Sequence, residues 1–338
     1  YCPIKEKTMT HPISRLIDQF FSAQLGKYRL PVICLLSLFM VAGCDSSDET
    51  TVVHLNEPAG DIKSTPPGKP DSAKNKYQFG FDLRNSPQED AAQYLPFLSY
   101  LEQETGYKFK LRFTSKNKSS EDDLGQGITQ FAAVGATASI HATERYGAIP
   151  LVRGINSIGK AKYRSMIVVA PDSKLNNVEE LRGKRFAFGS DNSTQGHLIP
   201  RIILLNKGIM LQDLGSYSYT GSHRNCANAV VSRKADACGM QDTLAVAMEE
   251  QGVLRILYTS DYYPSSGIVA NKDVPPQVRE KVRQALLNFD PKGRHKESLY
   301  HWDRTEMPNG FVATNEKDYQ PLKEWMTKLG FLNPEEAS

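Results

Sequence analysis

The chain has 338 residues, of which 40% are hydrophobic and 23% are charged, a composition typical of globular proteins. Its 41 basic and 38 acidic residues leave a formal net charge of +3. Residues 1–43 account for that surplus, with five Lys or Arg against two acids, so the rest of the chain is close to neutral. A nucleic-acid-binding protein needs a surplus of positive charge, which this remainder does not have.

An apolar run occupies residues 30–42 and follows Lys27 and Arg29. The run is too short to cross a bilayer comfortably, and its basic flank and its length are typical of a secretory signal. It ends in Val-Ala-Gly before Cys44, which resembles a bacterial lipobox. The resemblance implies a lipoprotein signal peptide at 1–43, lipid on the Cys44 thiol, and a membrane-anchored lipoprotein of the bacterial cell envelope that faces the periplasm.

Residues 44–76 are predicted to be a flexible tether. The segment is rich in Ser, Asp, Pro, Gly and Lys and has few large apolar residues, so it cannot bury enough surface to order itself. Such a tether lets a globular body sit at some distance from the membrane. About 260 residues remain, which suit two lobes better than one small core.

Short strands and helices alternate after the tether, the pattern of an α/β protein with mainly parallel sheets. The helix expected at 88–105 ends before Gly106 and contains Pro96, which should kink it or move its start. The expected strands are 77–83, 107–113, 131–135, 163–170, 185–188, 235–240 and 253–258. The other expected helices are 178–181, a run up to 207, 225–232, 242–251, 275–289 and 319–329.

The stretch 184–196, KRFAFGSDNSTQG, carries the clearest functional signal. An alternating strand ends at Gly189, a polar loop follows, and a cluster of hydroxyl residues leads into the apolar run of the next helix. Unpaired backbone N–H groups and the positive end of a helix dipole meet at such a place, and an oxyanion is a natural guest. The alternative is an ordinary Ser/Thr helix cap with nothing bound.

Five cysteines reduce to two that concern the globular part. Cys2 and Cys34 lie in the predicted signal and Cys44 is the predicted lipid site. Cys226 and Cys238 would lie in an oxidising compartment, where a disulfide forms if the helix with one packs on the strand with the other. We expect two small buried thiols, with the disulfide as the alternative.

Further segments share one order and spacing over residues 77–290: YRSMIVV at 163–169, LRGKRFAF at 181–188, NSTQG at 192–196, GSH at 221–223, and KADACG at 234–239. Together they resemble the substrate-binding proteins of phosphate, phosphite and phosphonate ABC transporters. The resemblance implies a two-lobed clamshell of the periplasmic-binding-protein type II fold. Lobe 1 would comprise 77–168 plus 262–338 and lobe 2 residues 169–261, with crossings near 165–170 and 259–268.

The same resemblance implies how a ligand is held. The first two hydroxyls of the cluster resemble those that hold phosphonate oxygens, and backbone N–H groups complete the cradle. His223 resembles the histidine that contacts the anion, and Asp242 the acid that receives a proton or an amino group of the ligand. The predicted ligand-binding residues are Ser193, Thr194, Gln195, Gly196, His223 and Asp242.

The chain departs from the family pattern at several positions. Gln195 stands where a third hydroxyl is usual, and Arg224 follows His223 where an acid is common. Val134 or Ser139 occupies the place of one expected tyrosine. The half of the pocket from lobe 1 therefore differs from the family, which leaves a related oxyanion or another small polar ligand open. Asn117 replaces a second tyrosine, and Arg84, Asn85, Ser86 and Arg153 are further candidates from lobe 1.

Three other functions are weighed against binding for a transporter. Ser193, His223 and Asp242 could form a hydrolytic triad, but the serine lacks a Gly-x-Ser-x-Gly elbow. A lipoprotein of the same fold could report ligand to a membrane sensor. The histidines lack the close spacing of metal ligands. We therefore expect a non-enzymatic protein that captures a phosphonate- or phosphate-like oxyanion for an ABC permease, without cofactor, metal or nucleic acid.

Overall fold

The computed structural model describes residues 75–82, 86–114 and 118–332. The predicted signal peptide, Cys44 and all of the predicted tether except residues 75 and 76 lie outside them, so these stay predictions. Within the described part of the chain, no helix combines the length and the apolar character needed to cross a bilayer.

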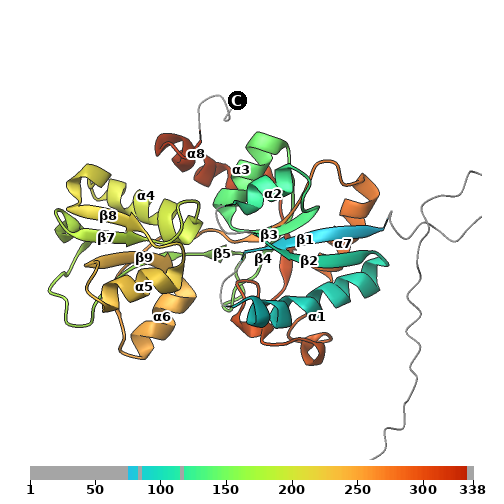
Figure 1. The fold of residues 1–338 in the computed structure, drawn as a ribbon, viewed down its shortest axis with the longest axis horizontal. Coiled ribbons are helices and arrows are strands. Elements are labelled where there is room, and N and C mark those ends of the chain that lie inside the picture. The colour runs from blue at the N-terminus through green and yellow to red at the C-terminus, as the bar shows by residue number, and fades with distance from the viewer. Residues whose placement is uncertain (1–74, 83–85, 115–117, 333–338) are drawn as a thin grey trace, which may run out of the picture. The chain divides into compact units, whose positions relative to one another are not determined.

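A six-stranded sheet, in the order β13-β4-β12-β3-β1-β2, forms what we call the first half (Figure 1). β1 pairs parallel with β2 and β3, whereas β12 lies antiparallel between β3 and β4, and β13 pairs antiparallel with β4. Four of the six strands therefore run in the same direction. The strands are β1 (Lys76–Phe81), β2 (Lys108–Phe113), β3 (Phe131–Val134), β4 (Ile149–Gly154), β12 (Gly267–Ala270) and β13 (Phe311–Ala313).

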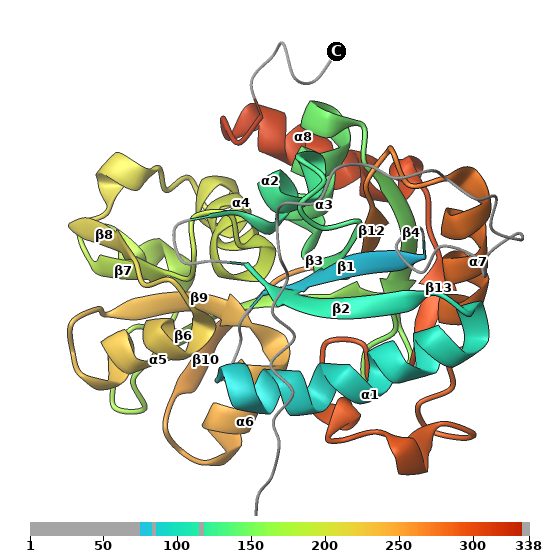
Figure 2. The ribbon, with the colours of Figure 1, turned by 45° about the vertical axis from the view of Figure 1, so that its right-hand side comes forward.

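Helices cover both faces of this sheet (Figure 2). α1 (Pro87–Thr105) and α7 (Pro276–Leu287) pack on the face that carries Phe79 and Phe81. α2 (Ser120–Gly125) and α3 (Ala136–Tyr146) pack on the opposite face, where Ala132 and Val134 are buried. The sequence pattern did not predict α2 or α3, because both are rich in small and polar residues and lack a long apolar stripe.

The second half contains a five-stranded sheet in the order β10-β6-β9-β7-β8. β7 pairs parallel with β8 and β9, and β6 pairs antiparallel with β9 and β10, so four of the five strands share a direction. α4 lies on one face, and α5 and α6 on the other. The elements are β6 (Ser165–Val169), β7 (Arg185–Phe188), β8 (Ser216–Tyr219), β9 (Ala237–Gln241), β10 (Arg255–Thr259), α4 (Ile199–Asn206), α5 (His223–Val231) and α6 (Asp242–Glu250).

Two short strands join the halves, β5 (Lys162–Tyr163) and β11 (Tyr263–Pro264), which pair antiparallel with each other (Figure 1). β6 hydrogen-bonds within the five-stranded sheet, although the predicted boundary left residues 165–168 with lobe 1. The remainder of the predicted division into lobes stays a prediction.

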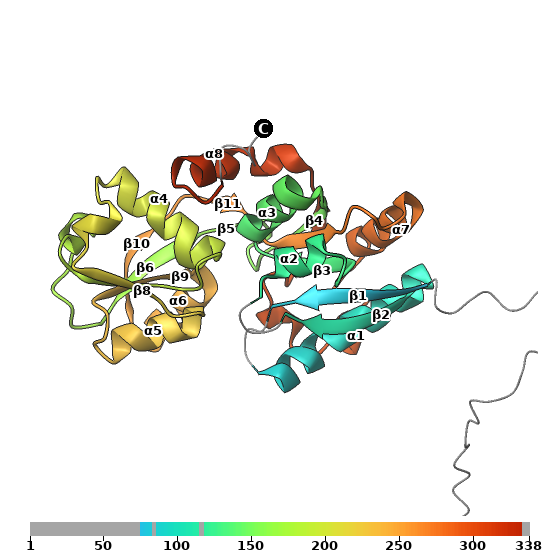
Figure 3. The same ribbon diagram turned by 45° about the horizontal axis from the view of Figure 1, so that its top comes forward.

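The last helix, α8 (Gln320–Lys328), contacts both halves (Figure 3). Lys323 Nζ lies 2.7 Å from Glu144 Oε2 of α3 in the first half. Leu322 and Met326 belong to the same buried cluster as Ile199 of α4 in the second half. The C-terminal helix therefore bridges the two sheets in addition to the two chain crossings.

The expectation of two free thiols in the second half was wrong. Cys226 of α5 and Cys238 of β9 form a disulfide, with their Cα atoms 5.8 Å apart. Both residues are fully buried, because α5 packs directly on β9. The alternative prediction, a disulfide formed because the helix with one cysteine packs on the strand with the other, is the arrangement found.

Removing this disulfide should destabilise the protein. The bond closes a loop of 12 residues, for which chain entropy gives about 3 kcal/mol of stability. We expect the free energy of unfolding of Cys226→Ala/Cys238→Ala, measured in urea, to fall by about that amount. A form lacking residues 1–44 should release no thiol on denaturation before reduction. Two reactive thiols at that stage would contradict the structure.

Candidate functional site

A close backbone approach shapes the loop after β7. Gly189 N donates to Gly196 O at 2.9 Å, which folds residues 189–196 back on themselves. A Cβ on Gly196 would lie 2.9 Å from Ser193 Oγ and 3.1 Å from the Gly189 Cα, so a side chain at this position would force its neighbours to shift. Ser193 ends this loop, and its Oγ accepts from Gly196 N at 2.9 Å. Ser193 thus caps a π-helical turn, Thr194–Leu198, that leads into α4.

Thr194 lies where the two halves meet. Its side chain is almost fully buried, and its Oγ1 accepts a hydrogen bond from Thr137 N at 2.9 Å. Thr137 belongs to the first turn of α3, in the first half. The Tyr163 hydroxyl, on the crossing strand β5, accepts from Ala136 N at 3.3 Å and is hydrogen-bonded to Thr194. Burial raises the pKa of Tyr163, so its hydroxyl stays neutral.

Gln195 connects the turn to the chain crossing and to Asp242. Its Nε2 donates to Arg164 O at 2.8 Å and to Asp242 Oδ1 at 3.3 Å. Its backbone O accepts from Ser165 Oγ at 2.6 Å. Asp242 Oδ2 accepts from Arg164 N at 3.1 Å. Burial raises the pKa of Asp242, and the negative charge of Glu306 adds to this.

His223 begins α5 and lies against the same turn. A Cβ on Gly196 would come within 3.0 Å of His223 Cε1, and one on Gly189 within 3.7 Å of His223 Nδ1. The loops that carry Ser193, His223 and Asp242 follow β7, β8 and β9, which are parallel, so they meet at one edge of the sheet. The structure therefore brings the six predicted residues together, while their role in binding stays a prediction.

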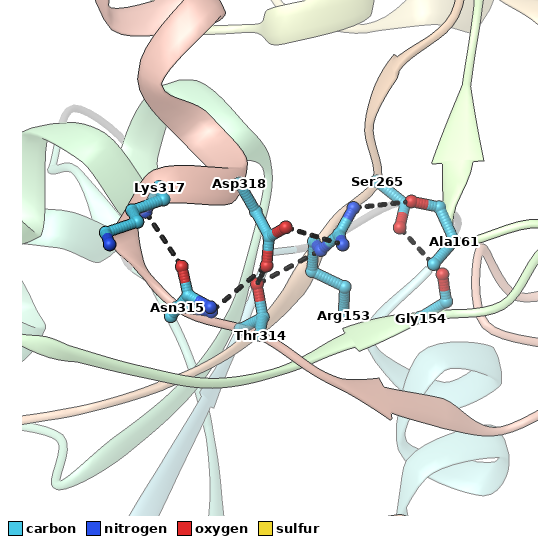
Figure 4. A network of polar contacts seen from close by, with 8 residues as sticks. All are labelled: Arg153, Gly154, Ala161, Ser265, Thr314, Asn315, Lys317 and Asp318. Atoms are coloured by element: carbon cyan, nitrogen blue, oxygen red, sulfur yellow. Dashed lines mark hydrogen bonds and ion pairs between the residues drawn. The ribbon is translucent and has the colours of Figure 1, made fainter.

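Arg153, a candidate from the first half, is engaged elsewhere. Its Nη1 donates to Ala161 O at 2.9 Å and its Nε to Thr314 Oγ1 at 3.0 Å. Its Nη2 lies 3.3 Å from Asp318 Oδ1. Figure 4 shows this network, which also contains the hydrogen bond from Ser265 Oγ to Gly154 O at 2.7 Å. Arg153 thus links the segment before β5 to the segment that leads into α8.

Ser86 and Val134, two further candidates from the first half, have other roles in the structure. Ser86 Oγ accepts from Glu89 N at 3.2 Å and caps α1. Val134 is buried in the core of the sheet. Arg84, Asn85 and Asn117 lie outside the described residues. The sequence pattern missed Thr137 and Tyr163, because only the pairing of distant segments brings them to Thr194.

The arrangement does not resemble a hydrolytic triad. Ser193 Oγ accepts a hydrogen bond from a helix amide, as a cap does. Both oxygens of Asp242 accept from amide groups, those of Arg164, Thr243 and the Gln195 side chain. Among the described residues there is no group of three or more His, Cys, Asp or Glu that could hold a metal ion. The geometry fits binding of a small group by hydroxyls and amides.

Comparison with known families identifies the chain. Residues 79–319 match the family described as phosphonate periplasmic substrate-binding proteins of ABC transporters. The chain belongs to this family. A similar curated relative is the "Phosphonates-binding periplasmic protein" of Escherichia coli (strain K12), 22% identical over 242 residues, which are 69% of this chain and 72% of the relative.

Two further comparisons agree with this membership. The "Probable ABC transporter phosphite binding protein PhnD1" of Prochlorococcus marinus (strain MIT 9301) is 25% identical over 186 residues, 50% of this chain and 61% of the relative. The structure of PhnD1 from the same organism with methylphosphonate has a TM-score of 0.67 at 18% identity, covering 76% of this chain and 99% of that one. The predicted family and the type II periplasmic-binding-protein fold are confirmed.

Buried His197, in the turn Thr194–Leu198, should make the stability of the protein depend on pH. Burial lowers the pKa of His197 to about 4, and the nearby Arg201 adds to this. As pH falls, His197 binds a proton in the unfolded chain before it does so in the folded protein. The stability that neutral His197 contributes is therefore complete above about pH 6.5 and is lost as pH falls toward 4. The His197 contribution to that loss is about 3 kcal/mol.

Urea unfolding at several pH values measures this effect. His197→Gln should flatten the curve between those limits. Exposed His301 has a positive φ, which asparagine tolerates, so His301→Asn is the control and should keep the wild-type slope. Equal slopes for all three proteins would show that His197 is not held neutral.

Proposed function

We propose that the protein captures a small phosphonate- or phosphate-like oxyanion in the periplasm and passes it to an ABC permease. The position of Thr194 is the observation that carries the proposal. Its hydroxyl stands at the start of a helical turn in the second half and is hydrogen-bonded to the first turn of α3 in the first half. A ligand bound there would contact both halves, so its binding would favour their closure.

The turn offers an anion more than one kind of donor. The amides of Thr194 and Gln195 begin the turn, where backbone N–H groups have no acceptor within the helix. The dipoles of the turn and of α4 add positive potential at the same place. His223 supplies an imidazole ring, whose Nδ1 lies beside Gly189. These groups are the neutral or positive donors that suit a tetrahedral oxyanion.

Asp242 restricts which oxyanion is accepted. Its pKa is raised by burial and by the neighbouring charge of Glu306. The carboxylate of Asp242 repels a fully ionised oxyanion at the turn unless a proton or an amino group lies between the carboxylate and the oxyanion. We therefore propose that Asp242 receives a proton or an amino group of the ligand.

The proposal extends to the cell surface. We propose that residues 1–43 are removed as a signal peptide and that lipid on Cys44 anchors the mature protein to the membrane, facing the periplasm. Membership of a family of ABC-transport proteins supports a permease as the partner. Nothing in the family's description concerns sensing, so the sensor alternative receives no support, and a catalytic step is not part of the proposal.

Substitutions in the turn should weaken binding of the true ligand. In a form lacking residues 1–44, a thermal-shift screen of phosphate, phosphite, alkylphosphonates and sulfonates finds ligands, because selective binding raises apparent stability. Ser193→Ala and Thr194→Val should each lower the affinity of the best of these by roughly 1–3 kcal/mol in calorimetry, because a charged acceptor loses a hydrogen bond.

Loss of a helix cap alone must be separated from loss of a ligand contact. Asn177 caps a short helical turn before β7, where its side chain accepts from Glu180 N at 3.1 Å. Asn177→Ala should lower stability and leave affinity unchanged. Unchanged affinity in both Ser193→Ala and Thr194→Val would refute the assigned site.

A further inference from the structure

Glu121 is a buried acid of the first half that reaches the site loop of the second half. It lies in the first turn of α2, and its side chain is only 4% exposed. Its Oε1 accepts from Asn192 Nδ2 at 3.4 Å, across the boundary between the halves. Its Oε2 is buried and has no hydrogen-bond partner in the described part of the chain. Such an oxygen lacks compensation for its lost hydration.

Two contacts from the first half bracket Ser193. Glu121 of α2 meets Asn192, the residue before Ser193, and Thr137 of α3 meets Thr194, the residue after it. α2 and α3 cover the same face of the six-stranded sheet (Figure 2). The carboxylate of Glu121 therefore contacts the residue that precedes Ser193 in the site loop.

The neighbouring acids are held by other partners. Asp122 Oδ1 accepts from the Tyr146 hydroxyl at 2.6 Å. Asp123 Oδ2 has no hydrogen-bond partner among the described residues, but it forms an ion pair with Arg112 Nε at 3.8 Å. Burial raises the pKa of Glu121, hydrogen bonds from its own backbone amide and from Asn192 partly offset this, and the charges of Asp82 and Asp122 add to the rise. The titratable or charged groups on the surrounding elements are Asp82 after β1, Arg112 on β2, Asp122 and Asp123 on α2, His141, Arg145 and Tyr146 on α3, and Asp191 in the site loop.

We propose that Glu121 is a specificity residue that shares one proton with an oxygen of the bound oxyanion. This inference rests on the proposed function and names the ionic form that the site selects, the protonated monoanion of a phosphonate or phosphate. A ligand P–OH donates to ionised Glu121, or protonated Glu121 donates to a dianion, and both routes give one complex with one proton between two oxygens. A sulfonate carries no proton near neutral pH, so Glu121 must first take one from water.

We assign this proton to Glu121, which leaves an amino group of the ligand as the partner of Asp242. Its two oxygens already accept hydrogen bonds from the Arg164 and Thr243 amides and from the Gln195 side chain. Glu121 Oε2 has no such donor, and a shared proton would supply one. The two acids thus approach the turn from different halves with different hydrogen-bonding needs.

Calorimetry in two buffers of different ionisation enthalpy tests the proposal, because it counts the protons taken up on binding. The probes are methylphosphonate and methanesulfonate, with the form lacking residues 1–44. Wild type should take up a proton with methylphosphonate above the second ionisation of that ligand. In Glu121→Gln the side-chain amide can donate an N–H hydrogen bond to the dianion without binding a proton from solution, so this proton uptake should disappear. The preference for methylphosphonate over methanesulfonate should then fall about tenfold or more.

Asp122→Asn is the matched control, because it removes the same charge one residue away. It should keep the wild-type proton uptake and preference. The same changes in Asp122→Asn as in Glu121→Gln would overturn the proposal, since a general field effect would explain both. A loss confined to 2-aminoethylphosphonate in Glu121→Gln would also overturn it, because Glu121 would then bind an ammonium group.

Wild-type measurements separate this inference from the proposed function. If wild type binds none of phosphate, phosphite and methylphosphonate, the proposed function fails. If it binds and Glu121→Gln keeps both proton uptake and preference, the shared proton is wrong and the proposed function stands. If the variant does not fold, the wild-type protein alone still tests the proposal. Binding of methylphosphonate without proton uptake, at a pH above the second pKa of this ligand, would overturn it.

Discussion

The hydrogen bond between Gly189 and Gly196 is the constraint on which the site depends. It folds the loop after β7 back so that Ser193 caps a turn directly at the end of the strand. A Cβ on either glycine would lie within 3.3 Å of the other's Cα, a contact tight enough that the two backbone segments would have to move apart. His223 occupies the space beside them. The start of a helical turn, the Ser193 hydroxyl and the His223 imidazole thereby lie close together.

The two halves contribute unequal chemistry to this point. The second half supplies amides, hydroxyls and His223, which are the groups the family resemblance implied. The first half supplies the start of α3 at Thr137, a tyrosine hydroxyl from Tyr163 on the crossing strand, and the buried acid Glu121. The family pattern has a tyrosine near β3, where this chain has Val134, which is buried in the core, or Ser139 of α3.

The crossings between the halves are tied to the C-terminal helix. Arg153 bonds the segment before β5 and the segment that leads into α8, so these parts are held as one unit. α8 then contacts α3 through Lys323 and Glu144 and contributes Met326 to the core of the second half. Any relative movement of the halves must therefore be accommodated at α8 as well as at the paired strands β5 and β11.

Sequence patterns by themselves determined the alternation of strands and helices, the α1 boundary at Gly106, and the strand, loop and capped turn around Ser193. Each depends on periodicity or on turn residues within a few positions. Only the tertiary structure decided the contact of Thr137 with Thr194, which are 57 residues apart, and the bond between Cys226 and Cys238. The order of strands in the two sheets creates these contacts, and strand order depends on pairings between distant segments that no local pattern records.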